Sequence, residues 1–502
     1  MKINKKVFIP TVSVIVFVLI LVVLNLTKVQ QSVDAIYSYL SHNFSWLFIL
    51  ANIAALVFSL FMVFGPYSKV KLGGNKAKPE YSNFSWLAMI FTTSCSAGLI
   101  VFGFIESIIY ASAPPFQIEP FTTKAYEYAQ VYSHYHWGLN AWTLYVPATI
   151  AIGYMFYNRK SKNISMSSAC EPVLKNKKGK TFWSSLIDVF STFGAVVAPV
   201  TSMGLGMPLL TLLLQNIFNI ADKHIPILQI IILVIWIAIF SSSVYLGLKK
   251  GIKRLSDANV ITAFVFMIFV GILAGVFNVF KAEINTLGLY IQEFVHMVTA
   301  TDPYGNGDFV ANWTVWYWAW LIVYMPLMGV FNARISKGRS LRQITIAQMI
   351  GCSVGSWIAM STLGNYAIQL QQSGVDIANV INTLGQPAAI LTIISSMPLP
   401  KVMMVIVAIL CFVFMATTMD SSAFVAAETT MIHEKPDDLA PRWSRVLWAV
   451  IACLITFVLL QVGGFNAVQV LAILIGFPLA ILMFVVIYSA IKVLKEDHKK
   501  MK

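Results

Sequence analysis

The stretch NWTVWYWAWLIVYMPLMG, residues 312–329, places four tryptophans within eight positions of an otherwise apolar segment. This segment can cross a membrane as a helix, because about 20 apolar residues span the hydrocarbon core. Five of its residues would share one helix face, at spacings of four, three, four and four: Trp313, Tyr317, Trp320, Tyr324 and Met328. Buried aromatic rings can hold a cation that lacks hydrogen-bond donors, such as a trimethylammonium group. The alternatives are simple packing and, for Trp313 and Trp316, an interfacial aromatic belt.

The whole chain has the composition of a helical membrane protein. Of its 502 residues, 58% are hydrophobic and 11% are charged, and apolar runs of about 20 residues recur along the chain. We predict an all-α polytopic membrane protein with twelve spans, at residues 7–26, 46–65, 86–112, 136–157, 183–218, 226–248, 259–280, 313–333, 343–370, 401–430, 443–463 and 466–491. We expect an amphipathic interfacial helix at 283–300 and a short, partly inserted segment at 374–400.

The distribution of basic residues supports these spans. Lys and Arg collect in the cytoplasmic loops of membrane proteins. With the N-terminus in the cytoplasm, only five of the 35 lie outside: Lys28, Lys124, Lys223, Lys281 and Lys401. The sequence therefore predicts a multi-pass protein of the cell (inner, cytoplasmic) membrane, with both termini in the cytoplasm. Because this orientation also explains the net charge of +14, we expect no nucleic-acid partner.

Small and polar residues interrupt three of the predicted spans. Span three carries a run of small and hydroxyl residues at 92–98, followed by Glu106. Span five carries GLGMP at 204–208, and span ten carries TTMDSS at 417–422. Small residues can serve close helix packing. Interrupted helices with polar groups in separate parts of a chain are typical of transporter binding sites, so the pattern favours transport.

Other classes of membrane protein fit less well. The sequence has no HExxH motif, and the spans bring no Ser/His/Asp group together, so we do not expect an enzyme. It also lacks the repeated filter loop or rings of charge that a channel would need. The five cysteines have no CxxC spacing, and His134 and His136 alone do not predict a metal site. A membrane sensor that binds onium compounds without transporting them remains a remote alternative.

Several motifs along the chain resemble one transporter family. They are FGPY (64–67), APPF (113–116), HWGLNAW (136–142), GLGMPL (204–209), KKGIKRLSDAN (249–259), WYWAW (316–320) and ARISKGRSLRQ (333–343). In this order they resemble the betaine/carnitine/choline transporter (BCCT) family. The resemblance implies a secondary active transporter of quaternary-ammonium compounds such as carnitine, glycine betaine, choline or γ-butyrobetaine. It also implies a homotrimer.

The resemblance further implies a five-plus-five inverted repeat, as in amino acid/sodium symporter-like transporters. Spans three to seven form the first repeat and spans eight to twelve form the second. We divide the chain accordingly into two N-terminal transmembrane helices (1–85), the first repeat (86–282), the interfacial helix and linker (283–312), the second repeat (313–491) and a cytoplasmic tail (492–502).

Within the family, the pattern most resembles the carnitine/γ-butyrobetaine exchangers. That likeness implies a substrate site in which Trp137, Trp320 and Tyr324 cage the ammonium group, Met328 lies near the substrate carboxylate, and Cys95 and Ser96 complete the lining. It also implies an outer vestibule lined by Trp313 and Tyr317. Two residues depart from the family pattern, because Leu321 and Ile109 stand where aromatic rings are expected. The cage has lost two rings, which points away from carnitine and toward a different or bulkier onium substrate.

The coupling mode is open between symport and exchange. By the same likeness, a fixed arginine fills the cation site of the exchangers, and Asn259 stands at that position here. The hydroxyls of Thr417 and Thr418, with carbonyls of Thr92 and Cys95, offer the oxygen donors that a hard cation requires. These residues favour symport with Na⁺ as coupling ion and no other cofactor. The sequence SCSAG (94–98) and Met328 favour the alternative, a sodium-independent substrate:product antiporter.

Three further sets of charged residues have expected roles. Glu106 is expected to pair with a basic residue of the loop ahead of it or to take part in transport. Asp188 is expected to be a cap or loop partner near the cytoplasm. The basic residues of the loop after span eight are expected to stabilise the inner side rather than to touch substrate: Arg334, Lys337, Arg339 and Arg342.

Overall fold

The computed structural model describes residues 2–24, 26–95, 97–175, 178–246, 251–305, 307–432, 439–462 and 464–501. The helices of the first half are α1 (Lys5–Leu24), α2 (Leu26–Asn43), α3 (Ser45–Phe64), α4 (Asn83–Cys95), α5 (Gly98–Ser112), α6 (Thr123–His136), α7 (Leu139–Thr143), α8 (Val146–Tyr157), α9 (Met166–Ala169), α10 (Glu171–Leu174), α11 (Lys180–Phe218), η1 (Asp222–His224), α12 (Ile225–Leu246), α13 (Gly251–Leu273) and α14 (Val276–Thr299). Those of the second half are η2 (Val310–Val315), α15 (Trp316–Ile335), α16 (Leu341–Ile346), η3 (Ala347–Gly351), α17 (Cys352–Gln372), α18 (Ile377–Leu384), α19 (Gln386–Ser395), α20 (Pro400–Thr429), α21 (Arg442–Val462) and α22 (Gly464–Met501).

The predicted all-α polytopic membrane fold is confirmed. Each of the twelve predicted spans coincides with one helix or with a run of consecutive helices. Within the described residues, eight helices are long and apolar enough to cross a membrane, and the pair α4–α5 is a ninth candidate that bends by 59°. A strand pair joins the N-terminal segment to the segment that follows α20, because β1 (Lys2–Ile3) pairs with β2 (Met431–Ile432) in antiparallel register.

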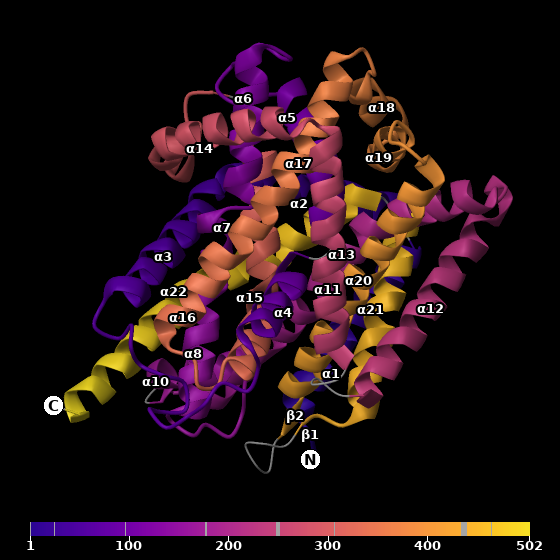
Figure 1. The fold of residues 1–502 in the computed structure, drawn as a ribbon. Helices are drawn as coiled ribbons and strands as arrows, with labels where there is room; N and C mark the ends of the chain where they lie inside the picture. The colour runs from indigo at the N-terminus through magenta and orange to yellow at the C-terminus, as the bar shows by residue number, and fades with distance from the viewer. Residues whose placement is uncertain are drawn as a thin grey trace.

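The helix α15 occupies the centre of the bundle (Figure 1). It packs against α8, α11 and α22, and α11 also packs against α20. The most apolar window between Val310 and Ile335 is entirely buried inside the protein. This part of the helix therefore does not face lipid. A helix that is apolar all round belongs in the core of a large bundle. The aromatic stretch 312–329 therefore belongs to the central helix of the fold, α15, and to the segment η2 that leads into it.

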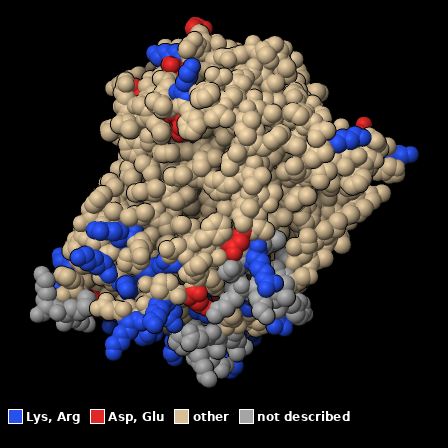
Figure 2. All heavy atoms as spheres, in the orientation of Figure 1, with Lys and Arg blue, Asp and Glu red and all other residues tan. Residues whose placement is uncertain are grey.

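Basic side chains lie mainly at one end of the molecule (Figure 2). Both chain termini lie at that same end in Figure 1. The opposite end carries α14 and the pair α18–α19, which correspond to the predicted interfacial helix and to the predicted segment at 374–400.

Two predictions about individual spans are wrong. The predicted interruption in span five is absent, because α11 is one continuous helix even though Pro199 and Pro208 lie inside it. Gly206 instead permits close packing, since a Cβ there would lie 2.7 Å from Met415 Sδ. Span seven ends at Leu273 rather than at 280, and α14 begins at 276 rather than at 283.

Span three, by contrast, is broken as expected. The helices α4 and α5 meet at a bend between Cys95 and Gly98. Gly98 is required there for steric reasons, because a Cβ would lie 2.6 Å from Cη2 of Trp320 and 3.5 Å from Cη2 of Trp137. The break thus lies against two of the predicted cage residues, Trp137 from the first half of the chain and Trp320 from the second.

Candidate functional site

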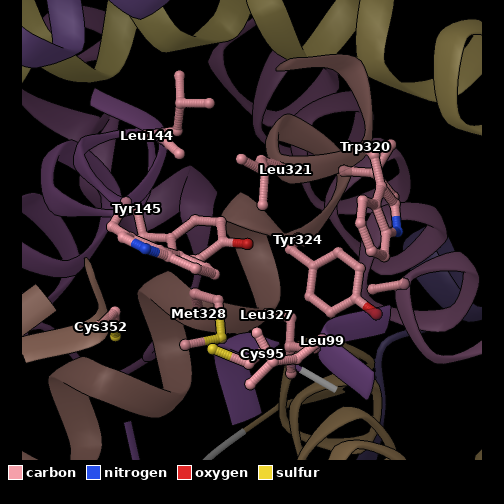
Figure 3. Packing of buried hydrophobic residues seen from close by; sticks show 14 of the residues in the cluster. Cys95, Leu99, Leu144, Tyr145, Trp320, Leu321, Tyr324, Leu327, Met328 and Cys352 are labelled. Atoms are coloured by element: carbon pink, nitrogen blue, oxygen red, sulfur yellow. The ribbon is translucent and has the colours of Figure 1, made fainter. Parts of the chain in front are cut away.

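Three residues predicted to form a cage lie together beside the α4–α5 break. Trp137 follows α6, whereas Trp320 and Tyr324 lie one turn apart on α15, and all three are buried. The ring of Trp320 lies 6.0 Å from that of Trp137 and 6.0 Å from that of Tyr324, at interplanar angles of 82° and 88°. Figure 3 shows Trp320 and Tyr324 among the buried side chains around them. Edge-to-face contacts of this kind are the favoured arrangement for aromatic pairs.

A fourth tryptophan extends this aromatic cluster. Trp316 is fully buried and stacks on Trp320, with centroids 5.3 Å apart and planes 9° from parallel. Because Trp316 is buried inside the bundle, it does not face lipid as a residue of an interfacial belt would. Trp320 Nε1 donates a hydrogen bond of 2.8 Å to Thr201 Oγ1 on α11. The orientation of the Trp320 indole is therefore fixed by stacking and by a hydrogen bond.

Glu106, on α5, is buried directly beside the cluster. Its Oε2 accepts hydrogen bonds from Trp137 Nε1 and from the Tyr317 hydroxyl, both at 2.8 Å. Its Oε1 lies 3.7 Å from Nδ1 of the buried His136, which also forms a 2.8 Å hydrogen bond with the Tyr110 hydroxyl. The expected basic partner from the preceding loop is wrong, because the basic group beside Glu106 is His136 at the end of α6. A carboxyl group thus holds one ring of the cage in place.

The other predicted substrate residues lie around the same break. Met328 is buried on α15, with its sulfur 4.0 Å from Ser94 Oγ. Cys95 is buried at the end of α4, with Sγ 3.7 Å from Ser356 Oγ on α17. Ser96 lies outside the described residues. Two of the three lining residues are therefore placed where α4, α15 and α17 meet.

The departures from the expected aromatic pattern are both beside the cluster. Leu321 is buried and Ile109 is half-buried. One residue further along α5, Tyr110 packs edge-on against the half-buried Trp313, with centroids 5.1 Å apart. With Tyr317, which is 1% exposed, these residues form an outer aromatic group next to the cage. The predicted vestibule residues Trp313 and Tyr317 are thus packed against neighbours in this conformation.

The predicted cation ligands lie on α4 and α20. The hydroxyls of Thr417 and Thr418 are buried and donate to a carbonyl of their own helix, at 2.9 and 3.0 Å, which leaves their lone pairs as acceptors. Thr92 Oγ1 also donates to a carbonyl of its own helix, that of Ala88 at 2.9 Å, and lies 2.9 Å from a serine hydroxyl on α13. The contact that bridges α4 and α20 is between the hydroxyls of Thr93 and Ser421, 3.2 Å apart. The sequence missed this pair, although both residues belong to the polar runs it singled out.

Asn259 and Asp188 lie in different surroundings, Asn259 within a helix and Asp188 beside a loop. Asn259 is buried on α13, and its Nδ2 has no hydrogen-bond partner among the described residues. Asp188 accepts hydrogen bonds from the backbone N–H of Ser167 at 3.0 Å and from its hydroxyl at 2.6 Å. Asp188 is therefore the loop partner that the sequence predicted.

The basic loop after α15 binds neighbouring loops and helix ends. Arg339 donates to Asn83 Oδ1 at 2.5 Å and to the Tyr81 carbonyl at 2.9 Å, and its guanidinium lies 4.4 Å from the ring centroid of Trp86. Arg342 donates to the carbonyl at the end of α3, 2.8 Å away. These contacts agree with a role in stabilising the inner side.

One further motif resembles an enzyme signature only in its spacing. Residues 351–355, GCSVG, match the GxSxG pattern, whose serine needs a sharp strand-to-helix turn. Here Ser353 lies inside α17, and its hydroxyl donates to the Met349 carbonyl at 2.5 Å. The motif is part of a packed helix and does not present a nucleophile.

Comparisons with known proteins agree with this architecture. The chain resembles the structure of MhsT in complex with L-phenylalanine at 14% identity, covering 82% of this chain and 89% of that one, with a TM-score of 0.48. It resembles the substrate-bound outward-open state of a Na⁺-coupled sialic acid symporter at 12% identity, covering 88% and 86%, with a TM-score of 0.50. At such identities the second likeness bears on the fold alone. The family BCCT, betaine/carnitine/choline family transporter, matches residues 6–499, and the chain therefore belongs to this family of multi-pass membrane transporters.

Proposed function

We propose that this chain is a secondary active transporter of quaternary-ammonium compounds and that the aromatic cluster binds the onium head. One observation carries the proposal: rings from both halves of the chain, Trp137 from the first and Trp320 and Tyr324 from the second, meet beside a broken helix. Transporters of this architecture bind substrate at the interface of their repeats and alternate access around it.

The chemistry of the cluster suits a cation without hydrogen-bond donors. Each ring face contributes about 0.5–2 kcal/mol to binding such a cation, depending on desolvation. The carboxyl group of Glu106 lies in the same buried region and accepts a hydrogen bond from Trp137 Nε1. A cationic substrate is therefore attracted by the ring faces of the cluster.

We infer that the substrate differs from carnitine or is bulkier. Leu321 and Ile109 occupy positions where the exchangers are expected to carry rings, so fewer faces are available and more apolar volume surrounds the head. Met328 remains as the residue closest in role to the exchangers' carboxylate contact.

We further propose that sodium drives uptake. Two features support this. The hydroxyls of Thr417, Thr418 and Ser421 are buried on α20, and that of Ser421 contacts Thr93 on α4. Asn259 is neutral where the exchangers are expected to carry an arginine. Sodium prefers oxygen ligands, and a hydroxyl-rich junction next to a helix break offers them. The protein would act in the cell membrane with both termini in the cytoplasm, as a homotrimer.

The test is uptake of radiolabelled onium compounds into proteoliposomes. Vesicles are either empty or loaded with γ-butyrobetaine, with and without an inward sodium gradient. Accumulation in empty vesicles that needs the gradient supports symport. Uptake only into loaded vesicles, independent of sodium, identifies the antiporter instead.

Two variants refine this test. Ser421→Ala removes a hydroxyl from the α4–α20 contact and should shift the sodium dependence to higher concentration. Thr429→Ala is the matched control, because Thr429 is also buried on α20 and also bonds a carbonyl of its own helix, two turns away. An equal effect of both variants would contradict the placement of the ion.

A further inference from the structure

A cavity lies at the outer end of the molecule, away from the aromatic cluster. It has a volume of about 390 Å³ and is enclosed by α13, α14 and α17, which lie together in Figure 1. This volume falls in the range of small-ligand sites. The proposed transport site uses none of its lining residues.

The walls of this cavity are apolar and partly open to the membrane side. Ile268 on α13, Phe280 on α14 and Val354 on α17 line it, and their side chains are 60%, 64% and 48% exposed. Along α17 the lining runs from Val354 to Thr362, eight residues or roughly 12 Å of helix. The cavity therefore extends from the level of the interfacial helix α14 down along two membrane-spanning helices.

The end of the cavity nearest α14 is polar. Glu283 and Ser361 line it, and Glu283 Oε2 accepts hydrogen bonds from Ser361 and, at 3.1 Å, from His134 Nε2. His134 Nδ1 donates to the Gln130 carbonyl at 2.9 Å, so Nε2 donates to Glu283 when the ring carries both protons. The hydrogen bonds that the described residues make to Glu283 all go to Oε2. Oε1 is thus left as an acceptor at the rim.

Glu283 is ionised at neutral pH. Burial raises the pKa of its carboxyl, but the hydrogen bonds and charge of His134 and the hydrogen bond from Ser361 outweigh burial and lower the pKa below its ordinary value. An ionised carboxyl only accepts hydrogen bonds. A ligand at this end must therefore bring donors or positive charge.

We propose that this cavity binds one acyl chain of a phospholipid with a primary ammonium headgroup, with the ammonium on Glu283. The shape supports a lipid because the polar end lies at the level of an interfacial helix and the apolar part descends along membrane helices. The charge selects the headgroup. A phosphatidylglycerol headgroup would place a net negative charge beside the carboxyl of Glu283. A choline headgroup has no N–H that could donate to this carboxyl.

The test is lipid retention by the purified full-length protein, measured by native mass spectrometry. The protein is incubated with equal amounts of phosphatidylethanolamine and phosphatidylglycerol that carry the same acyl chains. We expect one tightly held phosphatidylethanolamine per chain, preferred by about tenfold, as a charge-assisted hydrogen bond would give. Equal retention of the two lipids by the wild-type protein would overturn the proposal.

Two pairs of variants locate the site. Glu283→Gln should abolish the headgroup preference, whereas Glu293→Gln should keep it, because Glu293 is also a carboxyl on α14 paired with a histidine, at 3.3 Å, and does not line the cavity. Ile358→Trp fills the cavity and should lose the bound lipid, whereas Ile409→Trp, on the exposed face of α20, should keep it.

Other outcomes are equally clear. If Ile358→Trp keeps the lipid, the chain does not lie in this cavity and the proposal is wrong. If Ile358→Trp leaves lipid binding intact and dissociates an oligomer in gel filtration, the surface is a contact between copies instead. Because bound lipid is weighed directly, none of these results depends on which substrate the protein transports.

Discussion

Replacing Trp320 with leucine should weaken onium binding more than replacing it with phenylalanine. Trp320 is 2% exposed, stacks on Trp316 and meets Trp137 and Tyr324 edge to face. Alanine would be a poor choice, because removing a buried tryptophan to alanine costs about 3–5 kcal/mol of stability through the cavity it leaves. Leucine and phenylalanine leave smaller and similar gaps, and both lose the hydrogen bond to Thr201.

The difference between these two variants isolates the ring face. Only phenylalanine keeps a π-surface, and one face is worth about 0.5–2 kcal/mol to a bound cation. At 1.4 kcal/mol per factor of ten, the leucine variant should have a dissociation constant about two- to thirtyfold above that of the phenylalanine variant. Losses of stability that both variants share cancel in this comparison.

The assay is equilibrium binding of the radiolabelled onium substrate to purified protein, by scintillation proximity. A neutral isostere, with carbon in place of the ammonium nitrogen, serves as the matched ligand and should not distinguish the two variants. If both variants bind the onium compound equally, or if the neutral isostere separates them just as much, Trp320 does not hold the cation through its ring face.

Three further changes test other parts of the structure. Glu106→Leu removes the acceptor that holds the indole N–H of Trp137 and the hydroxyl of Tyr317, so Trp137 loses its fixed orientation and onium affinity should fall several-fold in the same binding assay. Gly98→Ala should abolish most uptake because its Cβ would overlap an indole of the cage, whereas Gly288→Ala, with open space around the same atom, should be silent. Arg339→Ala should lower the free energy of unfolding by about 2 kcal/mol, measured by denaturant titration, because two hydrogen bonds and a ring contact are lost.

The sequence predicted the parts of the site that depend on periodicity. The stripe from Tyr317 to Met328 lies on α15, and spacing alone placed Trp320 and Tyr324 one turn apart, whereas Trp313 lies in the preceding segment η2. The break in span three was predicted from a run of small residues. The same reasoning failed in span five, because a glycine looks alike whether it unwinds a helix or lets a neighbour approach. Gly206 does the latter.

Long-range hydrogen bonds were beyond the reach of sequence patterns. Glu106 accepts hydrogen bonds from Trp137 and Tyr317, which lie 31 and 211 residues further along the chain. No sequence motif predicts a contact at either separation. The pairing of Thr93 with Ser421 spans 328 residues. Thr93 and Ser421 were in polar runs that the sequence marked as unusual, at 92–98 and 417–422. Tertiary packing alone decided which members of those runs meet.

The contacts within the aromatic cluster bear on how binding could drive transport. Trp137 meets Trp320 edge to face at 6.0 Å, so the edge of one ring covers a face of the other. A cation bound by both faces needs its own place within about 6 Å of each centroid, and this requires the two rings to separate. Trp137 belongs to the first half of the chain and Trp320 to the second. An onium head that inserts between them would therefore favour a different relation of the two halves, which is the differential interaction that a ligand needs in order to shift a conformational equilibrium.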